Sequence, residues 1–98
     1  MRELLYSIVV PVYKSEPSLR ELAERVDRTF EGIEGDYELI LVEDGGGDKS
    51  WEVMRSLREE NRKVKIIRLT RNFGQHNALM CGFSFASGDF IITIDDDL

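Results

Sequence analysis

The sequence predicts an α/β protein built on a parallel sheet, because strand-like and helix-like segments alternate along its 98 residues. Four short runs consist almost entirely of apolar residues, as parallel strands buried on both faces do. Between them, apolar residues recur at helical spacing. This alternation favours one sheet with right-handed crossovers. The length suits one compact domain or part of one, and no internal repeat or linker interrupts it.

The predicted strands cover residues 7–12, 38–43, 64–70 and 90–95. Ser18, followed by Glu21, matches a capping box, so we expect the Ser18 hydroxyl to cap the first helix. That helix is indicated by apolar residues at helical spacing, namely Leu19, Leu22, Ala23, Val26, Phe30 and Ile33.

The second and third helices carry weaker patterns than the first. The second is indicated by three apolar residues: Trp51, Met54 and Leu57. The third is predicted over residues 75–86, although Gly82 lies inside it and lowers the helix propensity. Gly88 can supply a left-handed turn after this helix. Trp51, Phe83 and Phe85 are most simply packing residues.

The composition excludes several classes of protein. A formal net charge of −6 and a pI near 4.8 weigh against nucleic-acid binding, which needs a basic surface. Cys81 is the only cysteine, so there is no disulfide framework or cysteine metal cluster, and the composition suits a reducing cytoplasm. The apolar run at residues 8–12 is far shorter than the roughly 20 residues that cross a bilayer, so we expect a soluble chain.

The residues that follow each strand are the candidates for a binding site, because open parallel sheets bind ligands beyond the carboxyl ends of their strands. Three of the four strand ends carry carboxylates, and the remaining end carries a guanidinium. This predicts that acidic side chains from separate strands gather at one rim. The candidates are Pro11, Tyr13, Glu16, Glu43, Asp44, Arg71, Asn72, Asp95, Asp96 and Asp97.

The three consecutive aspartates predict a metal site. Buried without compensation, they would cost several kcal/mol, and a divalent cation would remove that cost. In an extended chain Asp95 and Asp97 point the same way and Asp96 points the opposite way. Asp95 and Asp97 are therefore suited to hold Mg²⁺ or Mn²⁺, which also takes oxygens from a diphosphate. The alternative is a solvated strand end, the usual state of a charge run.

Four other residues each have more than one interpretation. Asp44, which precedes three glycines, either begins a flexible turn or accepts a hydrogen bond from the N–H of a base. Tyr13 belongs either to the core or to the site. Arg71 either pairs with the carboxylates or contacts a phosphate. His76, the sole histidine, is either a catalyst or ligand or, more simply, a polar residue at a helix start.

Five short motifs follow one another along the chain in the order seen in the inverting glycosyltransferases of the GT-A fold, and they resemble the motifs of that group. Within that group they look most like polyprenyl-phosphate sugar transferases, which include dolichyl-phosphate mannose synthases and bactoprenol glucosyltransferases. Residues 70–88 are especially similar to undecaprenyl-phosphate 4-deoxy-4-formamido-L-arabinose transferases. The motifs are Val-Val-Pro-Val-Tyr at 9–13, Val-Glu-Asp-Gly at 42–45 with Asp48 and Ser50, Arg-Asn-Phe-Gly at 71–74, Gly-Asp at 88–89, and Ile-Asp-Asp-Asp-Leu at 94–98.

The resemblance implies a strand order of 3-2-1-4 and makes residues 1–98 the nucleotide-sugar-binding part of the domain. It assigns Asp95 and Asp97 to the metal motif, with Asp97 as the catalytic residue. It also implies that the donor site contains Pro11, Tyr13, Glu16, Asp44, Arg71 and Asp96.

The implied reaction moves a sugar from a nucleotide diphosphate sugar, UDP favoured over GDP, to a polyprenyl phosphate with inversion. In the family an acceptor-binding half follows the metal motif, and the whole protein works at the cytoplasmic face of a membrane. We therefore expect the 98 residues alone to bind donor at most. Exposed strand edges can also pair with a second copy to give a dimer.

The chain departs from the family beside the nucleoside pocket, where Lys14 and Ser15 replace the usual Asn and Glu. This puts the base preference in doubt. Two other classes compete with the glycosyltransferase. A dinucleotide-binding domain needs glycines after the first strand, and residues 12–18 contain none. A non-catalytic nucleotide-binding or interaction module of the α/β class is the alternative.

Overall fold

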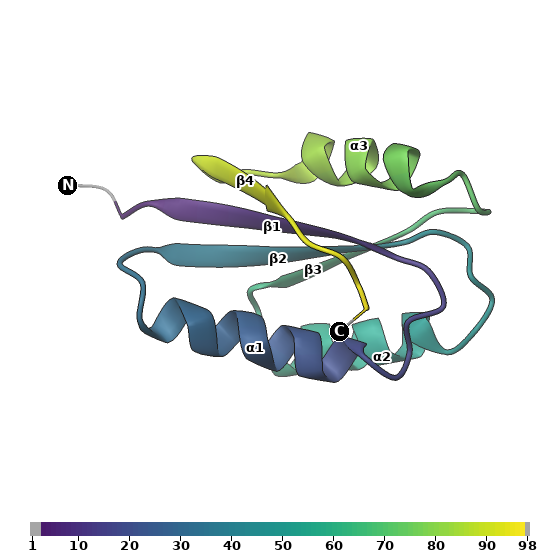
Figure 1. The fold of residues 1–98 in the computed structure, drawn as a ribbon, viewed down its shortest axis with the longest axis horizontal. Coiled ribbons are helices and arrows are strands. Elements are labelled where there is room, and N and C mark those ends of the chain that lie inside the picture. Colours follow the sequence, from purple (N-terminus) through teal and green to yellow (C-terminus); the bar gives the residue numbers. More distant parts are fainter. Residues whose placement is uncertain (1–2, 98) are drawn as a thin grey trace.

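The computed structural model describes residues 3–97 and confirms the α/β class. Its four parallel strands lie in the order β3-β2-β1-β4, as expected. Helices α1 and α2 cover one face of the sheet and α3 covers the other (Figure 1). The elements are β1 (Leu5–Val12), α1 (Leu19–Glu31), β2 (Asp36–Glu43), α2 (Ser50–Glu60), β3 (Val64–Arg68), α3 (Gln75–Phe85) and β4 (Phe90–Thr93).

The core is divided between the two faces of the sheet by strand alternation. Val9, Ile40 and Val42 point toward α3, where they pack with Ala78. The α1 and α2 side holds the larger cluster, which includes Ile8, Val10, Val12, Leu19, Leu22, Leu39, Leu41 and Met54. Both faces of β1 and β2 are therefore apolar, which explains their nearly continuous hydrophobic runs.

Gly82 lies inside α3 because the helix runs close to the sheet. A Cβ at this position would lie 2.4 Å from Cγ1 of Val9 and 3.2 Å from Cγ2 of Val42. The glycine therefore costs some helix propensity but permits the close approach. Phe83 packs against the same apolar cluster, whereas Phe85 is 59% exposed, so its assignment as a packing residue was wrong.

The structure corrects two predicted helix ends. The Ser18 hydroxyl makes no capping bond to α1, and Glu21 pairs instead with Arg25 along the helix at 3.2 Å. The helix α3 ends at Phe85 and continues into extended backbone at Ala86 rather than a left-handed turn at Gly88.

The strand order reverses at β1, since β2 and β3 lie on one side of it and β4 lies on the other. At the carboxyl end of β1 the β4 side is open. The strand β4 pairs with β1 only as far as Val9, whose carbonyl accepts a bond from the Ile94 N–H at 3.3 Å. Pro11, two residues further on, faces the same side, where β4 has already ended. A proline, which has no N–H to donate, fits a position without a neighbouring strand.

A buried polar cluster lies near the amino-terminal ends of the strands. Glu38 Oε2 accepts bonds from Ser7 Oγ at 2.5 Å and from the Ser87 N–H at 2.6 Å, while Oε1 pairs with Lys65 Nζ. The Gly88 N–H donates to Ser7 Oγ at 2.8 Å. Burial tends to raise the pKa of Glu38, but the bonds from Lys65, Ser7 and Ser87 outweigh it and hold the pKa below its usual 4.5.

Within residues 3–97, none of the helices has the length and apolar character that a membrane span requires.

Candidate functional site

A polar cleft of about 160 Å³ opens at the carboxyl ends of β1 and β2, beside the point where strand order reverses. Ligands of open α/β sheets bind at this kind of position. Four predicted site residues line it, namely Pro11, Tyr13, Asp44 and Asp96. Three further lining residues come from the β3–α3 loop and the start of α3: Asn72, Gly74 and Gln75.

Asp44 is 3% exposed and holds the wall of the cleft together. Its Oδ1 accepts the Phe73 N–H at 2.8 Å, and its Oδ2 accepts the Gly74 N–H at 3.0 Å. The amide of Asn72 donates to the same Oδ2 at 3.3 Å and to the Asp44 carbonyl at 3.0 Å. Asp44 is therefore no flexible turn, because it fixes the β3–α3 loop against the end of β2.

Gly45 allows the β3–α3 loop to lie directly on the β2–α2 loop. A Cβ on Gly45 would come within 2.4 Å of backbone atoms of Arg71 and Asn72, and its φ of +68° is a left-handed value. The glycine after Asp44 thus serves close backbone approach. The sequence analysis named Asn72 as a site candidate and included Gly74 only in the Arg-Asn-Phe-Gly motif, and it assigned no site role to Gly74 or Gln75.

Tyr13 is a wall residue and not a core residue. Its ring is 45% exposed and carries Lys14 Nζ at 5.2 Å from the ring centroid. Lys14 has a φ of 54°, an uncommon value for a residue with a side chain. The turn after β1 therefore has an unfavourable backbone conformation at Lys14, and the Lys14 cation lies over the Tyr13 ring.

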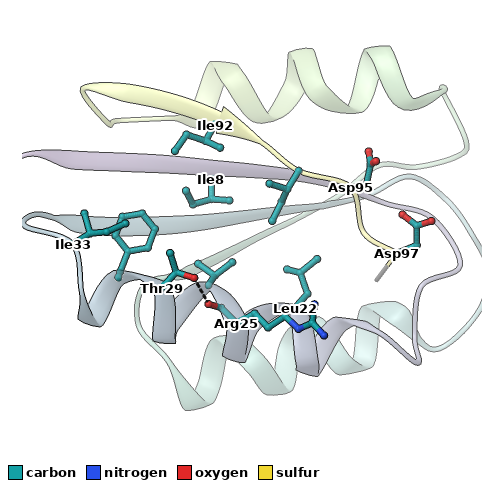
Figure 2. Close-up of a pocket in the computed structure, with 11 residues that line it drawn as sticks. Ile8, Leu22, Arg25, Thr29, Ile33, Ile92, Asp95 and Asp97 are labelled. Carbon is teal, nitrogen blue, oxygen red and sulfur yellow. Dashed lines mark hydrogen bonds between the residues drawn. The ribbon is translucent and has the colours of Figure 1, made fainter.

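Asp95 and Asp97 lie on the other side of their segment from Asp96, as strand alternation predicts. Asp96 lines the polar cleft, whereas Asp95 and Asp97 line a larger cavity of about 470 Å³. In Figure 2 both carboxylates lie at one end of that cavity, with Ile33 at the other. The remaining lining is mainly apolar and comes from α1, β1, β4 and the residues just after α1 and β4: Ile8, Leu22, Val26, Phe30, Ile33, Ile92 and Ile94 with Arg25 and Thr29.

The predicted gathering of carboxylates around one cation was wrong for Glu16 and Asp44. Among residues 3–97 no group of three acidic, histidine or cysteine side chains is close enough to share a metal ion. Glu16 lines neither cavity and accepts the Lys49 N–H at 3.3 Å. Asp95 and Asp97 are exposed, so they pay no burial cost that a cation would need to relieve.

Asp95 and Asp97 nevertheless fit part of a metal site. Neither forms a hydrogen bond or ion pair with another residue that the structure describes, so their oxygens are open to a ligand. Two carboxylates together with substrate phosphates form the usual ligand set of Mg²⁺, which rarely takes an all-protein cage. The pair thus suits a cation that arrives with a diphosphate.

Arg71 and His76 lie near the cleft without lining it. The Arg71 guanidinium stacks on the Phe73 ring at 4.6 Å from the centroid, and it forms no ion pair with a carboxylate in the described part of the chain. The structural pairing of Arg71 with the acidic rim was therefore wrong. His76 is an exposed residue in the first turn of α3, as the simplest interpretation held.

Solved structures establish the class of this fold. The chain is similar to S. aureus TarS 1-349 in complex with UDP, with a TM-score of 0.80 and 23% identity over 96% of this chain and 28% of that chain. It is also similar to the mannosyltransferase PcManGT from Pyrobaculum calidifontis in complex with GDP-Man and Mn²⁺, with a TM-score of 0.80 and 20% identity over 99% of this chain and 28% of that chain. The fold is that of a GT-A glycosyltransferase.

The sequence comparison gives the family. Residues 7–98 match the family model of glycosyl transferase family 2, and the chain belongs to that family. Two curated relatives bear the name undecaprenyl-phosphate 4-deoxy-4-formamido-L-arabinose transferase. The relative from Proteus mirabilis (strain HI4320) is 47% identical over 94 residues, and that from Enterobacter sp. (strain 638) is 44% identical over 93 residues. Each match covers 94% of this chain and 28% of the relative's length.

Proposed function

We propose that this chain is the donor-binding part of a glycosyltransferase that moves a sugar from a UDP-sugar to a polyprenyl phosphate with inversion. The observation that carries the proposal is the polar cleft at the switch point of the sheet, where Pro11, Tyr13, Asp44 and Asp96 meet. The curated relatives are named for transfer to undecaprenyl phosphate, and this supports the acceptor class. Because the chain spans 28% of their length, we propose contacts with the acceptor only for the whole protein and not for these 98 residues.

The nucleoside is proposed to bind against Tyr13, with Asp44 reading the base. A carboxylate offers about four acceptor positions. Asp44 uses three of them on the β3–α3 loop, which leaves about one for a ligand. One free acceptor matches the single ring N–H of uracil better than the adjacent N–H groups of guanine. This supports a UDP-sugar over a GDP-sugar.

Asp95 and Asp97 are proposed to hold Mg²⁺ or Mn²⁺ together with the donor diphosphate, with Asp97 as the catalytic carboxylate. When bound, the cation would neutralise charge that builds on the departing nucleoside diphosphate. Arg71 is proposed to approach the same diphosphate by turning away from Phe73. The lipid phosphate is already ionised near neutral pH, so its attack on the anomeric carbon needs no strong general base from this chain.

The cellular site is proposed for the whole protein. A polyprenyl phosphate is held in a bilayer by its hydrocarbon chain, so its transferase must work at a membrane surface. A nucleotide sugar is a cytoplasmic metabolite, which favours the cytoplasmic face. No nucleic-acid partner is proposed, since the net charge is −6.

The test is calorimetric titration of the folded chain with UDP and with GDP, each with and without Mn²⁺. We expect UDP to bind more tightly than GDP and Mn²⁺ to strengthen UDP binding. Asp44→Asn should weaken UDP binding about tenfold in both conditions, because a hydrogen bond to a charged group contributes about 1.5 kcal/mol or more. Asp97→Asn should remove most of the increase in UDP affinity that Mn²⁺ gives, and it should leave UDP binding without Mn²⁺ unchanged.

The matched control is Glu52→Gln, which removes one negative charge from the exposed side of α2 and should bind UDP like the unchanged chain. Far-UV circular dichroism checks that each variant is folded. UDP binding that ignores both Mn²⁺ and Asp97→Asn would refute the cation assignment. Absence of binding to either nucleotide would refute the donor-site assignment.

A dimer is proposed through β4, because the two edges of the sheet differ in charge. The β3 edge carries Lys65 and Arg68, which discourage pairing. Strand β4 has the sequence Phe-Ile-Ile-Thr, is uncharged and is exposed along its length. Antiparallel pairing of two copies centred on Ile91 would place Asp89 opposite Thr93, so no carboxylates would face each other.

Sedimentation velocity tests the dimer. The unchanged chain should sediment as a dimer, and Ile91→Lys should sediment as a monomer because lysine on an edge opposes strand pairing. Met80→Lys changes an equally exposed apolar residue on α3 and should leave the dimer intact. A monomeric unchanged chain would contradict the proposal.

A further inference from the structure

Asp96 ties the segment after β4 to the loop after β1. Its Oδ2 accepts the Tyr13 N–H at 2.8 Å and also the Ser15 hydroxyl. The Ser18 hydroxyl donates to the Asp96 carbonyl at 2.7 Å. We call these four residues, Tyr13, Ser15, Ser18 and Asp96, the Asp96 clamp. It joins two segments about eighty residues apart in sequence.

The serines of the clamp reach the aspartate segment in addition to local carbonyls: Ser15 Oγ lies 3.1 Å from the Tyr13 carbonyl oxygen, and Ser18 Oγ lies 3.2 Å from that of Ser15. Ser18 occupies the N-cap position of α1, where a serine usually accepts an N–H of the first turn, yet it makes no such bond. Ser15 is 7% exposed, and its backbone N–H is held by Ser50 Oγ at 3.1 Å. Both hydroxyls are thus directed at the aspartate segment by the fold.

The clamp lies between the two cavities of the site. Tyr13 and Asp96 line the polar cleft, while Asp95 and Asp97, on either side of Asp96, line the larger cavity. Past Ile94, the bonds in the described chain that fix this segment are those of the clamp. A shift of the Tyr13 loop must therefore move the carboxylates of Asp95 and Asp97.

We propose that the Asp96 clamp couples the nucleoside cleft to the Asp95 and Asp97 carboxylates, so that nucleotide and divalent cation strengthen each other's binding. The inference rests on the proposed donor site. Ser15 and Ser18 are positioning residues: they touch neither ligand, and they hold the loop and the aspartate segment in register. Coupling of this kind is reciprocal, since each ligand changes the affinity for the other by the same factor.

The test compares the Mn²⁺ gain, defined as the Kd for UDP without Mn²⁺ divided by the Kd with it, among folded variants. In the unchanged chain we expect a gain of about tenfold, within the usual range of coupling between sites. In Ser15→Ala the metal-free Kd should stay within about twofold, while the gain falls below about threefold. Ser15→Thr keeps the hydroxyl and should restore the gain.

Ser84→Ala is the matched control, because its hydroxyl donates only within α3, to the Cys81 carbonyl at 2.7 Å. Should Ser15→Ala fail to fold, Ser18→Ala removes the other hydroxyl and must show the same loss of gain. If these serines had a merely structural role, replacing them by alanine would weaken UDP binding equally with and without Mn²⁺.

The outcomes separate the two proposals. A full Mn²⁺ gain in folded Ser15→Ala and Ser18→Ala would overturn the clamp and leave the donor site standing. An unchanged chain that binds UDP but gains nothing from Mn²⁺ would overturn the cation assignment and the clamp, and a chain that binds neither UDP nor GDP would overturn the donor site as well.

Discussion

Glu38, at one end of the sheet, and Asp95 and Asp97, at the other, are held in opposite ways. At the amino-terminal end Glu38 is 5% exposed, and both of its oxygens accept bonds from Ser7, Lys65 and Ser87. At the carboxyl end Asp95 and Asp97 are exposed, without a bond to any other described residue. One end uses its acid to stabilise the fold, and the other leaves two acids open to solvent.

Asp44, at the carboxyl end, is both bonded to the chain and open to a cavity. It is as buried as Glu38 and accepts bonds from the β3–α3 loop, yet it also lines the polar cleft. Burial alone therefore does not separate structural carboxylates from those of the site. Each of the two carboxylates accepts three bonds from the chain, so the useful distinction is that Asp44 also faces a cavity.

The largest expected effect tests the structural end. Glu38→Ala should lower the free energy of unfolding by about 3 kcal/mol, because it leaves the Ser87 N–H and Lys65 without their buried partner. Urea unfolding followed by far-UV circular dichroism measures the change. Glu34→Ala, at an exposed position, should stay within about 0.5 kcal/mol of the unchanged chain. A small effect of Glu38→Ala would remove the contrast between the two ends.

The pH dependence of stability sharpens the same contrast. The pKa of Glu38 is held below its usual 4.5 in the folded state, so its contribution is present above that value and is lost as the pH falls below it. The unfolding free energy of the unchanged chain should therefore fall more steeply below pH 4.5 than that of Glu38→Gln. Urea midpoints between about pH 6 and pH 3 provide the measurement. Parallel curves would show that another group carries the acid sensitivity.

The smallest expected effect tests the open end. Asp95→Asn and Asp97→Asn should each change the free energy of unfolding by less than about 0.5 kcal/mol without metal, because neither carboxylate has a partner among the described residues. The same urea experiment compares them with Glu38→Ala. A loss near that of Glu38→Ala would mean that these carboxylates support the fold.

The local sequence pattern was enough to predict the order of helices and strands, and also the side to which each aspartate of residues 95–97 points. Hydrophobic periodicity depends on residues a few positions apart, so it predicted all four strands and all three helices. The same alternation placed Asp95 and Asp97 opposite Asp96. Motif resemblance supplied the strand order. Of the residues that it implied for the donor site, Pro11, Tyr13, Asp44 and Asp96 share one cleft, whereas Glu16 and Arg71 do not line it.

Only the tertiary structure decided which partner each polar group takes. The Ser18 hydroxyl bonds to the Asp96 carbonyl rather than to its own helix, and Asp44 bonds to a loop that follows another strand. Such choices depend on which distant segments the fold brings within hydrogen-bond distance, and short-range periodicity carries no information about that. The sequence therefore determined where its acidic residues lie along the strands, while packing decided which of them remain open to a ligand.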